Sequence, residues 1–173
     1  MMKKHKQCFF YLINFILIAW LFPVSVAFAQ QRCIFYANQE THNTPGTSSI
    51  SNPNAAVMVA DTTDYSTLNT PLNALGILSA NQNLMFTAAG AANTPLVVKI
   101  GGVANTLAVA NQITIQAYNN NTAVNPAISG SALLTMLSSS GNSRIRLQPQ
   151  GAYNNVRIIL NSTLSLGYSI NIF

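Results

Sequence analysis

Hydrophobic and polar residues alternate with a period of two over several stretches of this chain. From Leu164 to Phe173 the sequence reads LSLGYSINIF, in which apolar side chains occupy every second position up to Ile172. Four further stretches alternate in the same way: residues 96–100, 113–117, 144–147 and 156–160. A period of two is that of a β-strand with one buried face. The pattern predicts strands at these places, and two apolar runs, residues 33–37 and 83–87, predict two more.

Residues that favour turns gather between the alternating stretches. Segments rich in Asn, Gly, Pro and Ser cover residues 43–54, 88–95, 119–126 and 138–143. Only two segments are candidates for helices, residues 56–60 and 132–137, and both are short. We therefore predict an all-β fold in the form of an antiparallel β-sandwich, with a closed barrel as the alternative. An outer-membrane barrel is disfavoured because outward positions carry Arg, Lys, Gln and Asn in place of an apolar band.

The first 29 residues have a different pattern. Three lysines, at positions 3, 4 and 6, precede an apolar run over residues 9–22, and Ala27-Phe28-Ala29 ends the segment. This layout is typical of a cleaved secretory signal peptide, and the run is shorter than the roughly 20 residues that span a bilayer. We predict a signal peptide over residues 1–29, a single domain over residues 30–173, and a secreted or cell-surface protein without a membrane span after cleavage.

Loss of the signal peptide would also change the charge. The full chain carries a formal net charge of +5, and without the three N-terminal lysines five cations and three acids remain, a net charge of +2. The five cations are Arg32, Lys99, Arg144, Arg146 and Arg157. They are scattered along the sequence, whereas nucleic-acid binding requires a dense basic cluster. We therefore exclude nucleic acid as a partner. Cys33 would be the only cysteine left, so an intrachain disulfide is excluded, and its apolar neighbours favour burial.

Candidates for catalysis are few in residues 30–173. The only histidine is His42, in a polar segment beside Glu40, and no motif pairs it with a nucleophile. We interpret His42 as a solvated loop residue and the protein as a non-enzyme. The residue counts also exclude a zinc site of the Cys/His kind.

Two of the three acids, Asp61 and Asp64, lie in residues 54–71, NAAVMVADTTDYSTLNTP. This segment resembles the NAVDGDLNTYSTLN-like segment of domains at the N-terminal end of large surface proteins secreted by Bacteroidota. The resemblance extends, in order, through CIFYANQETHNT, SISNP, LVVKIG, ITIQAYN, AYNNVRIIL and SLGYSINIF. More distantly, the chain is similar to discoidin-type, galactose-binding-like jelly rolls, with YNNVRI of residues 153–158 in the place of a late strand.

The resemblance implies a jelly-roll β-sandwich that binds carbohydrate or mediates cell adhesion, often with a structural calcium ion. Carried over to this chain, the calcium ligands would be Asp61, Asp64 and the hydroxyl of Thr67, together with backbone carbonyls. The chain departs from the family pattern because Asp61-Thr62-Thr63-Asp64 lacks the glycine found there. The alternative is that both aspartates cap turns through their own backbone.

A carbohydrate site requires an aromatic platform with polar groups on loops. The available residues are Tyr65, Tyr118, Asn119, Asn120 and Tyr153. Their alternative roles are ordinary, since tyrosines bury readily and a run of asparagines makes a turn.

Arg146 and Arg157 are further candidates for ligand binding. A hairpin through residues 148–155 that aligned Leu147 with Val156 would place the two arginines opposite each other, and like charges in that register destabilise a sheet. Either the strands are not neighbours in this register, or an anion such as an acidic sugar lies between the two side chains.

Two functions follow from the sequence. The first is a non-catalytic recognition or adhesion module that binds a glycan or another cell-surface component. The alternative is a self-associating structural subunit of a surface layer or extracellular fibre, which the low charge and the abundance of Asn and Thr favour.

Overall fold

The computed structural model describes residues 36–57, 63–71, 78–103, 106–138, 141–163 and 166–173. These residues belong to one compact unit, Ile34–Phe173. The predicted signal peptide, Cys33 and Asp61 lie outside the described residues. Within the described ranges, no helix is both long enough and apolar enough to cross a membrane.

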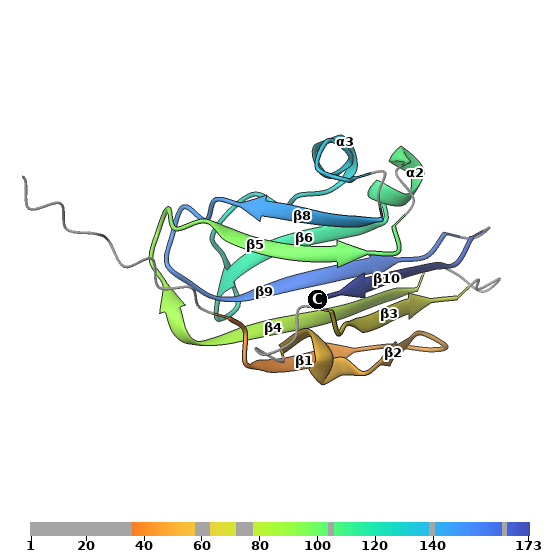
Figure 1. Ribbon diagram of the computed structural model, residues 1–173, viewed down its shortest axis with the longest axis horizontal. Coiled ribbons are helices and arrows are strands. Elements are labelled where there is room, and N and C mark those ends of the chain that lie inside the picture. Colours follow the sequence, from red (N-terminus) through yellow and green to blue (C-terminus); the bar gives the residue numbers. More distant parts are fainter. Residues whose placement is uncertain (1–35, 58–62, 72–77, 104–105, 139–140, 164–165) are drawn as a thin grey trace, which may run out of the picture. The chain divides into compact units, whose positions relative to one another are not determined.

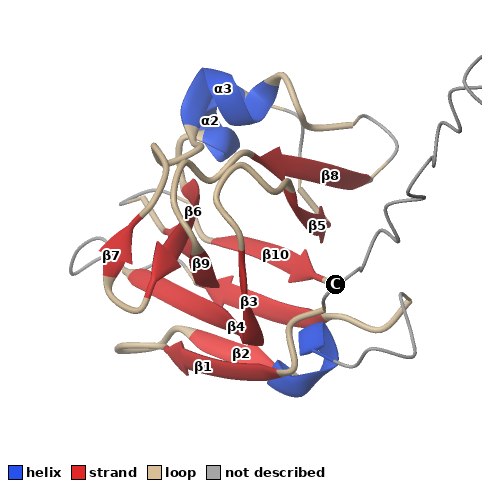
Figure 2. Cartoon of the chain, turned by 90° about the vertical axis from the view of Figure 1, so that its left-hand side faces the viewer, coloured by secondary structure: helices blue, strands red, loops and turns tan. Residues whose placement is uncertain are grey.

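The described strands form two antiparallel sheets of five strands each (Figures 1 and 2). In spatial order, the first contains β1 (Gln39–Asn43), β4 (Ser79–Gly90), β9 (Tyr153–Asn161), β6 (Ile113–Asn119) and β7 (Thr122–Ala123). The second contains β2 (Ser49–Ser51), β3 (Ser66–Thr70), β10 (Tyr168–Ile172), β5 (Leu96–Gly101) and β8 (Asn142–Leu147). We refer to them as the β4–β9 sheet and the β3–β10 sheet. The short helices are η1 (Pro53–Val57, a 3-10 helix), α2 (Leu107–Ala110) and α3 (Gly130–Leu134), the last two side by side.

Strands β3 to β10 pair as one long hairpin that is folded up on itself. β3 pairs with β10, β4 with β9, β5 with β8, and β6 with β7. Two further pairings complete the sheets: β10 also pairs with β5, and β9 also pairs with β6. Eight strands connected in this way make a jelly roll, to which β1 and β2 add one edge strand each. The predicted antiparallel β-sandwich with jelly-roll topology is therefore confirmed.

Alternate residues of both sheets meet in the core, as the pleat of a strand requires. In β5, Val98 and Ile100 are buried, whereas Val97 points outward and is 54% exposed. The largest fully buried side chains include Ile115 and Ile158 of one sheet and Ile145 and Ile170 of the other. The apolar positions that alternate in the sequence are therefore the ones that form the inner faces of the sheets. This holds for residues 96–100, 113–117, 144–147 and 156–160.

Several expectations for local structure were wrong. Strand β1 covers residues 39–43, which we expected to be a loop around His42, and residues 36 and 37 of the expected first strand lie before it. Strand β2 falls inside an expected turn segment, and β3 was not predicted. The last strand begins only at Tyr168, and Leu166 is exposed. Edge and polar strands lack the alternation that a buried face imposes, so the pattern could not reveal them.

The structure decides between the two alternatives for Arg146 and Arg157, because their strands are not neighbours. β8 pairs with β5, and β9 pairs with β4 and β6. Arg146 is therefore opposite Val97 in one sheet, whereas Arg157 is opposite Asn83 and Gln116 in the other. The two arginines do not face each other, and the repulsion expected from that register does not arise.

Candidate functional site

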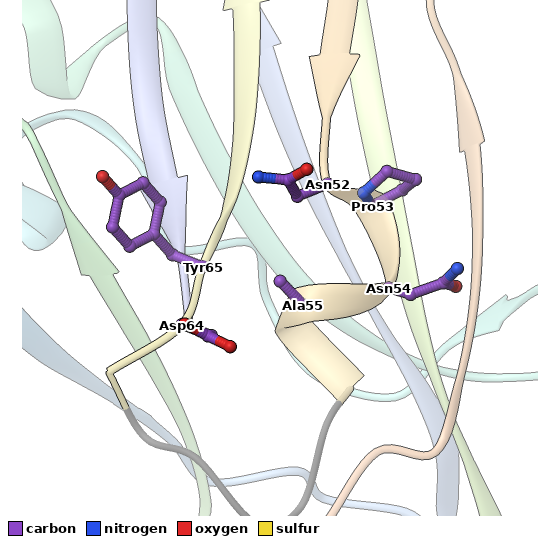
Figure 3. A pocket seen from close by; sticks show the side chains of 6 residues that line it. All are labelled: Asn52, Pro53, Asn54, Ala55, Asp64 and Tyr65. Atoms are coloured by element: carbon purple, nitrogen blue, oxygen red, sulfur yellow. The ribbon is translucent and has the colours of Figure 1, made fainter.

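A pocket of about 560 Å³ opens between η1 and the residues that lead into β3 (Figure 3). Its lining residues are Asn52, Pro53, Asn54, Ala55, Asp64 and Tyr65. Figure 3 shows Tyr65 and Asp64 on the β3 side and the other four on the segment that enters η1. A volume of this size is typical of small-molecule sites, which combine apolar surface with a few polar groups.

The local sequence explains the wall formed by η1. Asn52 follows β2 and has a φ of 50°, a left-handed conformation that asparagine tolerates better than most residues. Pro53 then supplies the fixed φ that suits the first position of a helix. The amide of Ala55 donates to the carbonyl of Asn52 over 2.9 Å, which closes the turn. The SNPN sequence therefore reverses the chain and places Asn52 and Asn54 beside the pocket.

Tyr65 forms the aromatic part of the opposite wall. Its side chain is 43% exposed, and its ring packs against Phe173 with 5.2 Å between centroids and a tilt of 54°. The Nζ atom of Lys99 lies 3.9 Å from the centroid of the Phe173 ring, a cation–π contact. Phe173 thus supports the Tyr65 ring from one side, and much of the surface of Tyr65 stays open to solvent.

A buried polar network holds η1 in place beneath the pocket. Gln82 of β4 is fully buried. Its Oε1 accepts a hydrogen bond of 2.6 Å from the hydroxyl of Ser66, and its Nε2 donates to the carbonyl of Pro53 over 2.8 Å. The same Nε2 is 3.4 Å from the carboxylate of Glu40, which is itself 3.2 Å from Nδ1 of His42. Gln82 therefore connects both sheets to the wall of the pocket.

Gln82 was not among the residues expected at a site, although the sequence contains a signal for its role. In NQNLMF, Gln82 lies two residues before Leu84, so both side chains are on the same, inward face of the strand. A polar side chain at an inward position needs partners inside the protein. That rule would have identified it as a member of a buried network.

The predicted calcium ligands have different positions. Asp64 lines the pocket, and Asp61 lies outside the described residues. The hydroxyl of Thr67 donates to Oδ1 of Asn171 over 3.0 Å on the outer face of the β3–β10 sheet. Within the described ranges, no cluster of three or more His, Cys, Asp or Glu side chains occurs. Asn52 and Asn54, which also line the pocket, carry amide oxygens, a ligand type that suits calcium.

Four of the predicted ligand contacts, Tyr118, Asn119, Asn120 and Arg157, lie on the β4–β9 sheet or at its β6–β7 turn, and none of them lines the pocket. The hydroxyl of Tyr118 donates to Gln116 over 3.1 Å, and the guanidinium of Arg157 lies 4.7 Å from the Tyr118 ring centroid. Asn120 follows Asn119 at the turn into β7 and has a φ of 53°. The backbone N–H of Asn120 donates to Oδ1 of Asn154, and Nδ2 of Asn154 donates to Oδ1 of Asn120, both over 2.8 Å. These contacts stabilise the hairpin and its neighbour β9.

Tyr153 is part of the core. Only 6% of it is exposed, and its ring meets Phe86 edge to face at 5.9 Å. A Cβ atom on Gly90 would lie 2.2 Å from Cζ of Tyr153, so the ring requires glycine at that position. Burial raises the pKa of the Tyr153 hydroxyl. The residue is not available as a platform for a ligand.

Comparison with known proteins shows likeness to carbohydrate-binding domains at low identity. No protein-family model and no curated protein matches the sequence. One similar solved structure is the lectin domain of lectinolysin complexed with Lewis B antigen, at 11% identity and a TM-score of 0.46, covering 80% of this chain and 93% of that one. A second is the family 32 CBM from C. perfringens NanJ in complex with galactose, at 9% identity and a TM-score of 0.46, covering 80% of this chain and 97% of that one. A third is the xylan-binding module CBM15, at 14% identity and a TM-score of 0.42, covering 80% of this chain and 89% of that one. Values this low do not define a ligand for this chain.

Proposed function

We propose that this protein is a secreted, non-catalytic recognition module that binds carbohydrate in the pocket between η1 and β3. The observation that carries the proposal is the combination of an exposed Tyr65 ring with the side chains of Asn52, Asn54 and Asp64 around one cavity. The predicted signal peptide supports secretion.

The chemistry of the lining suits a sugar ring. A sugar presents C–H groups on its faces and hydroxyls around its edge. The Tyr65 ring offers an apolar surface for the face, and its support by Phe173 limits the entropy lost on binding. The amides of Asn52 and Asn54 can both donate and accept, and the Asp64 carboxylate accepts, so hydroxyl groups would find partners of either kind.

The same pocket is our candidate calcium site. Asp64 and the amide oxygens of Asn52 and Asn54, together with Asp61, which precedes Asp64 by three positions in the sequence, would supply the oxygen ligands that the ion prefers. A bound cation would orient these side chains for the sugar.

The proposal is tested by replacing Tyr65. The probes are galactose, the Lewis b oligosaccharide and xylan, the ligands named for the similar structures, on an array with a calorimetric titration of whichever binds. We expect Tyr65→Ala to weaken saturable binding about tenfold, a loss of roughly 1.4 kcal/mol.

Tyr36→Ala is the matched control, because Tyr36 is similarly exposed and does not line the pocket. Its binding should equal that of the wild type. If the wild type binds none of an extended set of glycans, or if Tyr65→Ala binds as well as Tyr36→Ala, the pocket is not a carbohydrate site.

A further inference from the structure

Three of the four described cations lie on the outer face of the β3–β10 sheet. In β8, Ser143, Ile145 and Leu147 are buried, so Arg144 and Arg146 point outward and are exposed. In β5, Lys99 shares its face with the exposed Val97. Arg157, the fourth, belongs to the other sheet. Residues scattered in the sequence are thus gathered on two neighbouring strands.

The register brings these charges close together. Arg144 is directly opposite Lys99, and Arg146 is opposite Val97. Side chains opposite each other have Cβ atoms roughly 5 Å apart, and like charges in that position destabilise a sheet. Arg144 and Arg146 lie about 7 Å apart along the strand. An anion bound between Arg144 and Arg146 would offset the repulsion between these two side chains.

No described Asp or Glu side chain shares this face. The described acids are Glu40, which contacts His42 and Gln82, and Asp64, which lines the pocket. The remaining outward positions of β2, β3 and β10 are neutral, namely Ser49, Ser51, Thr67, Asn69, Ser169 and Asn171. The two arginines therefore create an uncompensated positive strip at one side of the sheet.

The strip is continuous with the pocket. The pairing of β3 with β10 and of β10 with β5, continued by one residue, puts Tyr65, Phe173, Lys99 and Arg144 in one row. The contact of Tyr65 with Phe173, and of Phe173 with Lys99, follows that row. A chain bound at Tyr65 could therefore extend over Phe173 to the arginines.

We propose that the outer face of β5 and β8 binds an anionic polysaccharide, with Arg144 and Arg146 pairing with carboxylate or sulfate groups on sugar units beyond the one in the pocket. This inference rests on the proposed carbohydrate function and names its substrate class. Arginine pairs with such groups through two parallel hydrogen bonds. Phe173 and Val97 provide apolar surface between the charges.

Other polyanions fit less well. A nucleic-acid site that makes 6–10 phosphate contacts needs a denser set of cations, and this face offers three. Anchoring to an anionic membrane gains only about 1 kcal/mol for each cation. Neither would use the row that leads to Tyr65.

The test measures binding of a soluble polyuronate and of a neutral xylan to the full chain as a function of salt. We expect the wild type to bind polyuronate more tightly than xylan at low salt, and Arg144→Gln/Arg146→Gln to weaken polyuronate binding at least tenfold while leaving the neutral glycan unaffected. Arg144→Lys/Arg146→Lys should restore part of the affinity, since charge is kept and the bidentate geometry is lost.

Gln39→Glu/Asn43→Asp is the control for net charge. It lowers the charge by the same two units at exposed positions of β1, in the other sheet, and should bind polyuronate nearly as the wild type does. Equal loss in both double variants, no preference of the wild type for polyuronate, or equally tight binding of a DNA oligonucleotide or of phosphatidylserine vesicles would overturn the inference. Loss of neutral-glycan binding through Tyr65→Ala reports separately on the pocket.

Discussion

Tyr153 is held in the interior by contacts on two sides. Phe86 meets its ring edge to face, and Gly90 leaves the space that the ring fills. Tyr65 has a different environment, because its ring packs against Phe173 and 43% of the residue stays exposed. The two tyrosines show that the role of an aromatic side chain depends on the packing around it.

Burial of Tyr153 predicts a loss of stability at alkaline pH. Its pKa in the folded protein is raised above the ordinary value of 10.0 by desolvation. The folded protein therefore keeps the proton after the unfolded chain has lost it. The stabilising contribution is complete below pH 10 and declines as the pH rises toward the folded pKa.

Tyr153→Phe removes this ionisation and isolates its effect. In denaturant titrations between pH 8 and pH 11, the stability difference between wild type and variant should be constant up to about pH 9 and then shift in favour of the variant. A difference that stayed constant to pH 11 would show that the hydroxyl is not desolvated.

At the scale of elements, Gln82 joins three parts of the chain. Its amide accepts from Ser66 at the start of β3 and donates to the Pro53 carbonyl at the start of η1, while its backbone belongs to β4. Gln82 therefore helps to fix the position of the pocket wall relative to β3.

Gln82→Met is expected to lower both stability and ligand affinity. The variant keeps the volume but leaves the Ser66 hydroxyl and the Pro53 carbonyl without their partner, which costs about 1–3 kcal/mol in unfolding free energy. A looser η1 should also weaken the binding of the glycan that the wild type binds. Chemical denaturation and calorimetric titration measure the two effects.

A double-mutant cycle with Ser66→Ala gives the control. Because Ser66 and Gln82 share a hydrogen bond of 2.6 Å, the two substitutions should be non-additive by at least 0.5 kcal/mol. Asn81→Ala, on the outer side of the same strand, should have a smaller effect. Additive substitutions would contradict the proposed link.

Strand β8 bears on the alternative function as a self-associating subunit. It is the last strand of its sheet, and exposed edges can pair with other chains. Arg144 and Arg146 place two like charges on this edge, a feature that opposes pairing between copies. Self-association through β8 is therefore disfavoured.

At the scale of the molecule, a ligand that binds only the folded state raises the stability of the whole domain. If calcium occupies the pocket, millimolar calcium should raise the melting temperature relative to a chelator, by an amount that grows with concentration. The coordinating charge would come from Asp64 and Asp61.

Asp64→Asn tests that assignment, because it keeps the shape of the side chain and removes its charge. The calcium-dependent shift should shrink or vanish in this variant, and magnesium should be a weaker substitute since it demands a stricter geometry. An unchanged melting temperature in the wild type would leave Asp61 and Asp64 as turn residues.

The sequence by itself determined the sandwich and its inner faces. Alternation at Val98 and Ile100, or at Ile158 and Leu160, is enforced by burial of one face and can be read without knowledge of the partner strand. It also marked Asp64 and Tyr65, because an apolar run there breaks into polar residues.

Only the tertiary structure decided which strands are neighbours. Local alternation does not encode pairing, so the jelly-roll order separated Arg146 from Arg157 and brought Lys99, Arg144 and Arg146 together. It also placed Phe173 against Tyr65 and Gln82 beneath Pro53. Such contacts join residues distant in the chain, and they depend on packing of the two sheets as a whole.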